Sequence, residues 1–244
     1  MAYVVLFASQ RSVGPEGIDR LARALGRTWI EARQWTLNAS PRVIARAGGA
    51  QDAERCVRAL REEGLDAEWV DESEVTSSAK MQRIRAVRVL DGLLECDGNV
   101  LAYSDVRALV RAKLVSNASR STVDVERVEA GRGVTVVVAT QKTERERVVE
   151  EALFVFGAHG ERWLLVHNAV RYAALGVALR PVQRENFEML VSMLRERLPR
   201  ERYDDSMCAA TTSNGATGDA VRSMDVLVHA IARRCGGAMR HPMR

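Results

Sequence analysis

The stretch from residue 3 to residue 70 constrains the fold most, because strands and helices follow one another there with almost no room for loops. The run Tyr3–Ala8 is apolar and rich in β-formers, which predicts a buried strand. The run Leu65–Val70 alternates apolar and polar residues, which predicts a half-buried closing strand. No obvious catalytic group stands out between them. The stretch therefore indicates a small α/β recognition domain rather than an enzyme.

Three helices are expected between these two strands. Apolar residues at helical spacing begin after Pro15 and stop at Gly26, which has the position of a C-terminal capping glycine. Thr28 can cap a second helix, expected from Trp29 to about Leu37. The third helix, ended by Gly64, is the clearest, since its apolar and charged residues fall on opposite faces.

Composition sets the outer bounds of the fold. A chain of 244 residues with 47% hydrophobic and 28% charged residues can bury the cores of two small domains, which excludes disorder throughout. No apolar run approaches the roughly 20 residues that cross a bilayer, and the first residues lack the basic region of a signal peptide. We therefore expect a cytoplasmic protein. The net charge of +4 permits an acidic partner without requiring one.

The four cysteines lie far apart in the sequence, without a Cys-x-x-Cys pair and without histidine at metal-ligand spacing. This pattern indicates buried or idle thiols, with no zinc site and no disulfide framework. We expect no metal, no cofactor and no catalytic residue. The cysteines are Cys56, Cys96, Cys208 and Cys235.

Three segments of the N-terminal third, Trp29–Arg33, Asn38–Ile44 and Arg61–Val70, resemble in order and spacing the C-terminal domain of the bacterial ribosomal stalk protein. The resemblance implies the fold of residues 1–70. It also implies that the first two helices offer a partly basic face to partner proteins.

The matching basic positions on that face are Arg23 and Arg33. Trp29 and Trp35 lie six residues apart, on different faces of one helix, so a small domain is not expected to bury both. One of them is expected to be an exposed recognition anchor. The alternative is that both arginines are simply solvated. These four residues are the predicted partner-binding residues.

A polar stretch over residues 71–83 is typical of an interdomain linker. Beyond it, residues 84–200 are expected to form a second domain, with hairpin turns at Asp91–Gly92 and Asp97–Gly98. The closely spaced strands predict an antiparallel β-barrel or sandwich, followed by an amphipathic helix that ends before Pro199. The further strand-like runs are 106–115, 122–128, 134–140, 152–156 and 163–166.

The plan of many strands followed by one helix, together with the segment Asn99–Val106, weakly resembles bacterial pleckstrin-homology-like domains. The overall class is therefore α+β: a small α/β ribosomal-stalk-like domain followed by a pleckstrin-homology-like β domain with a C-terminal helix. The resemblance implies binding of phosphoinositide headgroups or peptides. The acidic Asp91–Gly92 and Asp97–Gly98 turns do not suit phosphate.

Six basic residues of this region would form a stripe on paired strands, able to meet nucleic acid or an anionic lipid surface. No aromatic residues are interleaved among them, so stacking platforms for bases are missing. The alternative is that all six are solvated outward positions. They are Arg83, Arg85, Arg88, Arg107, Arg111 and Lys113.

The C-terminal part is expected to comprise a flexible linker over residues 201–218 and an amphipathic helix with a basic tail over residues 219–244. The helix would dock either into a partner groove or back on its own protein. Its apolar stripe consists of Val221, Met224, Leu227, Val228 and Ile231.

The sequence as a whole predicts a non-catalytic protein-interaction protein, an adaptor or scaffold with protein partners, and leaves its oligomeric state open. One alternative is a protein that binds nucleic acid or an anionic surface through its basic strands and tail. An enzyme is the third interpretation, and it would require a pocket that brings His159 or His167 to a carboxylate such as Glu151.

Overall fold

The computed structural model describes residues 1–7, 13–36, 41–129, 135–208 and 218–237. Side chains are described in these ranges except at residues 35–36, 115–129, 135–148, 177 and 218–222. The protein has a mixed α+β architecture with three sheets and a C-terminal helix.

The N-terminal part is a three-stranded antiparallel sheet in the order β2-β1-β3, with helices on one face. Both faces of β1 are buried: Val4 and Leu6 pack against the helices, whereas Tyr3 and Val5 pack on the opposite side. This explains why the first strand is apolar throughout. The elements are β1 (Ala2–Leu6), α1 (Pro15–Leu25), α2 (Trp29–Thr36), β2 (Arg42–Ala47), α3 (Ala50–Glu62) and β3 (Ala67–Asp71).

Local capping signals explain where the first two helices end and begin. Gly26 has the left-handed backbone, with φ of 60°, that glycine adopts most easily at a helix C-terminus. The Thr28 N–H donates to the Glu31 carboxylate at 2.9 Å, and the Glu31 N–H donates to the Thr28 hydroxyl at 3.3 Å. This reciprocal pair is a capping box, so both expected caps are confirmed.

The second half of the chain holds a five-stranded sheet in the order β11-β8-β9-β10-β4 and a three-stranded sheet in the order β5-β6-β7. Both predicted Asp-Gly turns are present, with φ of 81° at Gly92 and 83° at Gly98. The strands are β4 (Gln82–Arg83), β5 (Val87–Val89), β6 (Leu93–Cys96), β7 (Asn99–Ala102), β8 (Val106–Glu129), β9 (Thr135–Gly157), β10 (Arg162–Val166) and β11 (Tyr203–Met207). The remaining helices are α4 (Gln183–Arg197), α5 (Gly218–Cys235) and the short 3-10 turns η1 (Glu72–Glu74), η2 (Ser78–Lys80), η3 (Tyr103–Asp105), η4 (Ala173–Ala178) and η5 (Arg200–Arg202).

The predicted architecture was an antiparallel β-barrel or sandwich, and the described strands do not form a closed barrel. The two sheets remain separate, and two of the strand pairs in the larger sheet, β10 with β4 and β11 with β8, are parallel. Parallel pairs need long connections, which the sequence pattern of short neighbouring strands did not reveal. The resemblance to the ribosomal stalk domain and to pleckstrin-homology-like domains remains a proposal.

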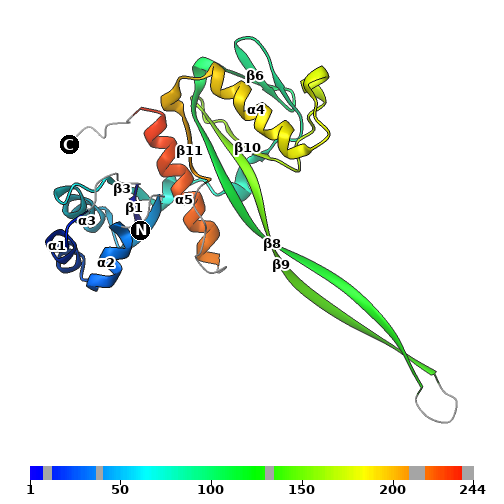
Figure 1. The fold of residues 1–244 in the computed structure, drawn as a ribbon, viewed down its shortest axis with the longest axis horizontal. Coiled ribbons are helices and arrows are strands. Elements are labelled where there is room, and N and C mark those ends of the chain that lie inside the picture. The colour runs from blue at the N-terminus through cyan, green and yellow to red at the C-terminus, as the bar shows by residue number, and fades with distance from the viewer. Residues whose placement is uncertain (8–12, 37–40, 130–134, 209–217, 238–244) are drawn as a thin grey trace.

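Four of the predicted strands are in fact two. Strand β8 is 24 residues long and β9 is 23, and they pair with each other from Val106 opposite Gly157 to Glu129 opposite Thr135. The polar runs 116–121 and 141–147 look like breaks in the sequence, but they contain neither proline nor glycine and continue the ladder. We call the outer part of this hairpin, residues 115–129 and 135–148, the arm. It extends far from the rest of the molecule (Figure 1).

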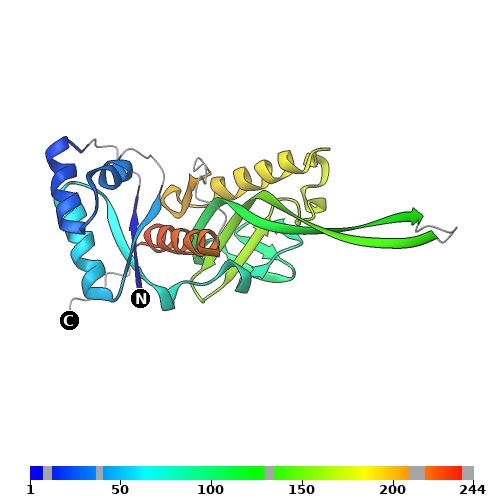
Figure 2. The same cartoon turned by 90° about the horizontal axis from the view of Figure 1, so that it is seen from below.

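Helix α5 lies between the N-terminal sheet and the five-stranded sheet (Figure 2). One continuous core joins β1, β8, β9 and α5, and it includes Tyr3, Phe154 and Ile231. The predicted linker takes part in this packing, since the Ser78 N–H donates to the buried Asp225 carboxylate of α5 at 3.0 Å. The two halves therefore share a core.

The flexible linker expected over residues 201–218 is also partly wrong. Residues 203–207 form β11, which pairs with β8, because this segment can extend the open edge of the large sheet. The expectation for residues 209–217 lies outside the described residues. Among the described helices, none is both long and apolar enough to span a membrane.

Acid is expected to loosen the contact made by α5 through His229. Burial lowers the pKa of His229 to about 4, and the charges of Arg233 and Arg162 act in the same direction. The imidazole therefore binds a proton more readily in the unfolded state than in the folded state. The contribution of His229 to stability is fully present above pH 6.5 and is lost as the pH falls toward 4. Allowing for partial exposure, we expect a loss of about 1–2 kcal/mol over this interval. Urea unfolding of the parent and of His229→Gln at both ends of the interval checks this, and equal losses in the two proteins would contradict it.

Candidate functional site at the root of the arm

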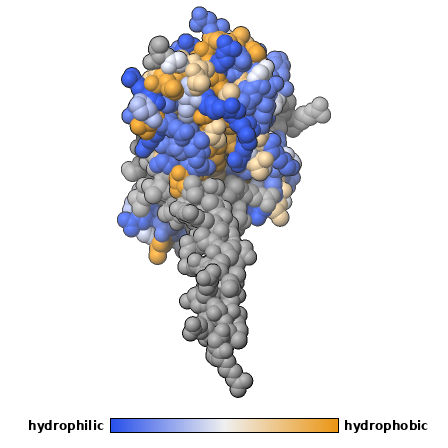
Figure 3. Space-filling view, turned by 90° about the vertical axis from the view of Figure 1, so that its right-hand side faces the viewer, coloured by the Kyte–Doolittle hydropathy of each residue, from blue (hydrophilic) through white to orange (hydrophobic). Residues whose placement is uncertain are grey.

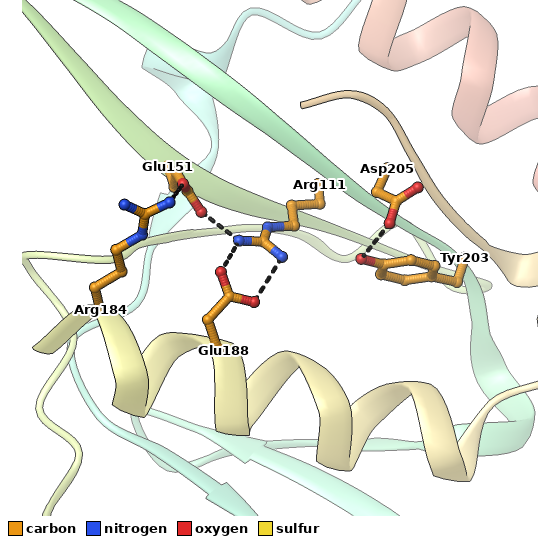
Figure 4. A network of polar contacts seen from close by, with 6 residues as sticks. All are labelled: Arg111, Glu151, Arg184, Glu188, Tyr203 and Asp205. Carbon is orange, nitrogen blue, oxygen red and sulfur yellow. Dashed lines mark hydrogen bonds and ion pairs between the residues drawn. The ribbon is translucent and has the colours of Figure 1, made fainter. Parts of the chain in front are cut away.

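A network of charged side chains holds the point where the arm leaves the body (Figure 4). Arg111 of β8 forms ion pairs with Glu151 of β9 and with Glu188 of α4. The second guanidinium nitrogen donates to the other Glu188 oxygen at 2.8 Å, so this pair is bidentate. Arg184, one turn before Glu188 on α4, donates to Glu151 at 3.4 Å.

The network is sheltered from solvent. The side chains of Arg111 and Glu151 are only 13% and 17% exposed, whereas that of Glu188 is 46% exposed. Burial raises the pKa of Glu151, but the hydrogen bond and charge of Arg111 outweigh burial and leave that pKa below its ordinary value. Burial likewise lowers the pKa of Arg111, and its two carboxylate partners reverse the effect. Arg111 and Glu151 are therefore both held in their charged forms.

Aromatic and thiol groups surround the network. The Arg111 guanidinium lies 5.7 Å from the ring centre of Phe187, and His167 meets the same ring edge-on at 6.2 Å. On the other side, the Tyr203 hydroxyl lies 3.4 Å from Asp205 (Figure 4). Burial raises the pKa of Cys208 to about 11, so this thiol is not a nucleophile at neutral pH.

This arrangement is suited to mechanical support. Every charged group at its centre has a partner, and within the described part of the chain no three His, Cys, Asp or Glu residues are placed to hold a metal ion. The network ties α4 to both strands of the hairpin across elements far apart in sequence. It therefore fixes the direction in which the arm leaves the sheet.

The predicted docking residues of the N-terminal helices are at the surface where described. Arg23 on α1 is exposed and pairs with Asp19 at 3.1 Å. Arg33 on α2 lies over the Trp29 ring at 5.3 Å, and Trp29 itself is 39% exposed. The side chain of Trp35 lies outside the described residues.

The structure does not bring the six basic residues of the predicted stripe onto paired strands. Arg83 lies on β4, at the far edge of the large sheet from β8, and Arg88 lies on β5, in the other sheet, where it pairs with Glu95. Arg111 is neutralised by its two glutamates. The remaining positions are Arg85 between β4 and β5, and Arg107 and Lys113 on β8.

For the C-terminal helix, the structure decides between the two alternatives left open by the sequence. Met224, Leu227, Val228 and Ile231 are buried in the protein's own core, so the helix packs on its own chain. The side chain of Val221 lies outside the described residues.

Of the three residues considered for an enzyme, the structure places His167 next to Glu151 and His159 away from them. The His167 N–H donates to the Glu151 carbonyl at 2.9 Å, so these residues are neighbours. His159 lies beyond the opposite end of β10, in an exposed turn beside Asp105. Glu151 is already bound by Arg111, whereas the buried Nδ1 of His167 has no hydrogen-bond partner among the described residues.

Sequence reasoning missed Arg184 and Glu188, although their i, i+4 spacing marks one face of a helix. It also missed the arm as a single element. Searches with this chain against models of protein families, against curated proteins and against solved structures find no match. The function must therefore be argued from the arm and its root.

Proposed function

We propose that this protein is a non-catalytic adaptor of the cytoplasm that contacts partner proteins through its arm. The observation that supports this most is the length of the β8–β9 hairpin: about 15 residues of each strand extend past the last core positions among the described side chains, or roughly 50 Å at the rise of a β-strand. A two-stranded ribbon is at best marginally stable alone in water, so a covering partner would stabilise it.

The charge of the arm favours a protein partner over nucleic acid. A nucleic-acid arm would need a clear excess of basic residues to neutralise phosphates. Residues 115–148 instead carry six basic and five acidic residues. The basic residues are Arg120, Arg127, Arg132, Lys142, Arg145 and Arg147, and the acidic ones are Asp124, Glu126, Glu129, Glu144 and Glu146.

The first two helices are a second candidate contact. Trp29 and its neighbour Ile30, which is 65% exposed, place apolar surface beside Arg33 on α2. Exposed aromatic residues next to arginine are common in the centres of protein interfaces. On the face of the body shown in Figure 3, orange patches are separated by blue ones, so no single apolar surface dominates that view.

Removing the arm is expected to abolish capture of partner proteins from native extract. Ser116 and Val148 lie opposite each other, so residues 117–147 can be replaced by an Asn-Gly turn between them. Among the described side chains of the two strands, the buried core residues lie at or before Ala112 and at or after Ala152, so the body keeps these core residues. Quantitative pull-down with the full chain and the shortened chain, each after nuclease treatment, measures the effect.

The matched control is Arg23→Glu with Arg33→Glu, which reverses two exposed charges without touching the arm. If the control variant lost the same proteins and the shortened chain retained them, the contact would lie on the first two helices and not on the arm. Release of all bound material by nuclease would favour the nucleic-acid alternative. Capture of no protein by the full chain contradicts the adaptor role.

A further inference from the structure

The register of the β8–β9 hairpin assigns the residues of the arm to two faces. Successive residues of a strand alternate between the faces of a sheet, and residues directly opposite each other in an antiparallel pair share a face. The register runs without a shift from Ala108 opposite Phe156 to Glu129 opposite Thr135. Odd-numbered residues of both strands therefore share one face, and even-numbered residues share the other.

Each face of the arm continues a different side of the body. Arg111 and Glu151 have odd numbers, and Arg111 pairs with Glu188 of α4, so the odd-numbered face lies on the side of the sheet that α4 covers. Ala112 and Ala152 have even numbers and lie in the core that contains α5. We call the odd-numbered positions of the arm the α4-side face and the even-numbered positions the α5-side face.

The two faces carry opposite formal charges. The α4-side face has three basic residues and one acidic residue, whereas the α5-side face has two basic and four acidic residues. The alternation of glutamate and arginine over residues 144–147 of β9 produces much of this separation. The charged residues of the α4-side face are Arg127, Glu129, Arg145 and Arg147, and those of the α5-side face are Arg120, Asp124, Glu126, Lys142, Glu144 and Glu146.

Arg145 and Arg147 have no acidic neighbour in the register of their face. Both stand opposite uncharged polar residues of β8, and the next rung of this face on either side is also uncharged. On the α5-side face, by contrast, Arg120 stands directly opposite Glu144. Two adjacent arginines placed in this way favour a ligand with carboxylates. The uncharged residues around them are Val115, Asn117, Ser119, Ser121, Thr143 and Val149.

The rest of the α4-side face suits a protein and not a nucleic acid. Val149, the next residue inward on this face, is 52% exposed, and mixtures of exposed aliphatic residues with arginine are typical of protein interfaces. The arm contains no aromatic residue on which a base could stack, and its positive charge is sparse for a phosphate backbone. The other aliphatic positions of the face are Val115, Val123, Val125, Val137 and Ala139.

We propose that the α4-side face of the arm, centred on Arg145 and Arg147, binds an acidic segment of a partner protein. Charge complementarity selects this occupant, because its carboxylates would meet the two guanidinium groups while its aliphatic residues cover the valines. The proposal rests on the proposed role of the arm as a contact element. It adds which face makes the contact and the chemistry that this face recognises.

Two double variants in the same arm test which face binds. Arg145→Gln with Arg147→Gln removes two positive charges from the α4-side face, and Arg120→Gln with Lys142→Gln removes two from the α5-side face. Both variants have the same net charge and the same number of changed residues. A general attraction between a basic chain and an acidic ligand would therefore weaken equally in the two variants.

The measurement is fluorescence anisotropy of a labelled oligoglutamate peptide titrated with the full chain at physiological salt. We expect the parent to bind this peptide more tightly than an oligolysine peptide of the same length. The Arg145/Arg147 variant is expected to bind it at least about fivefold more weakly than the parent, and the Arg120/Lys142 variant within about twofold of the parent. Matching thermal unfolding of the two variants shows that the bodies are intact.

Three outcomes overturn the proposal: no binding of oligoglutamate by the parent, equal weakening in the two variants, or tighter binding of a single-stranded DNA oligonucleotide that is lost in the Arg145/Arg147 variant. The last of these would identify a nucleic acid as the occupant. Protein partners captured in the pull-down without oligoglutamate binding overturn only this proposal. Oligoglutamate binding without captured partners leaves only the adaptor role unsupported.

Discussion

Replacing Ile231 with alanine is expected to lower the free energy of unfolding by about 3 kcal/mol, within the range of large-to-small substitutions in cores. Ile231 is 1% exposed and lies on α5, in the core that joins the N-terminal sheet to the large sheet. Because both halves share this core, the chain is expected to unfold in a single transition in the parent and in the variant.

Chemical denaturation followed by fluorescence and by circular dichroism measures this loss. Ile30→Ala is the matched control, since it removes the same atoms from a side chain that is 65% exposed, and it is expected to change stability by less than about 0.5 kcal/mol. Equal losses in the free energy of unfolding at the two positions would show that packing of α5 does not stabilise the shared core. Two separate transitions would show that the halves fold independently.

Features encoded by neighbouring residues were predictable. The cap at Gly26, the capping box at Thr28 and the turns at Gly92 and Gly98 all depend on a few adjacent residues, and all are present. The two strands and three helices expected in the first 70 residues follow from the same local signals, whereas the strand β2 was not expected. The resemblance to known families, by contrast, remains a proposal.

Features that depend on distant partners were not predictable. The polar run 116–121 breaks the apolar pattern of β8, but the opposite strand supplies its backbone partners. The stripe on α5 indicated a buried face without saying what covers it. The answer involves Asp225, whose partner Ser78 lies 147 residues away in the supposed linker.

The role of Arg111 at the candidate site also depends on residues distant in the sequence, so it was not predictable. By sequence it belongs to a row of basic residues, and that row suggests an anionic ligand. Its actual partners are Glu151 on the adjacent strand and Glu188 on α4, 40 and 77 residues later in the chain. Formal charge in the sequence therefore gave the wrong electrostatic picture, because ion pairing is decided by the tertiary fold.

Arg111→Met is expected to destabilise the protein by about 2–3 kcal/mol, a value between those of exposed and fully buried ion pairs. The substitution keeps an apolar side chain of similar length but leaves Glu151, only 17% exposed, without its principal cation. Most of the cost comes from this uncompensated carboxylate. Denaturant unfolding of the variant and the parent measures the difference.

A second substitution separates this cause from simple loss of packing. Adding Glu151→Gln to Arg111→Met removes the unpaired carboxylate charge and is expected to recover about half of the lost stability. Glu188→Gln alone should destabilise the protein less than Arg111→Met, because the side chain of Glu188 is 46% exposed. No recovery in the double variant would mean that the network contributes through packing alone. If the network orients the arm as proposed, Arg111→Met should also weaken partner capture in the same pull-down, and the double variant should not restore it, because α4 would still lack its bidentate link to β8.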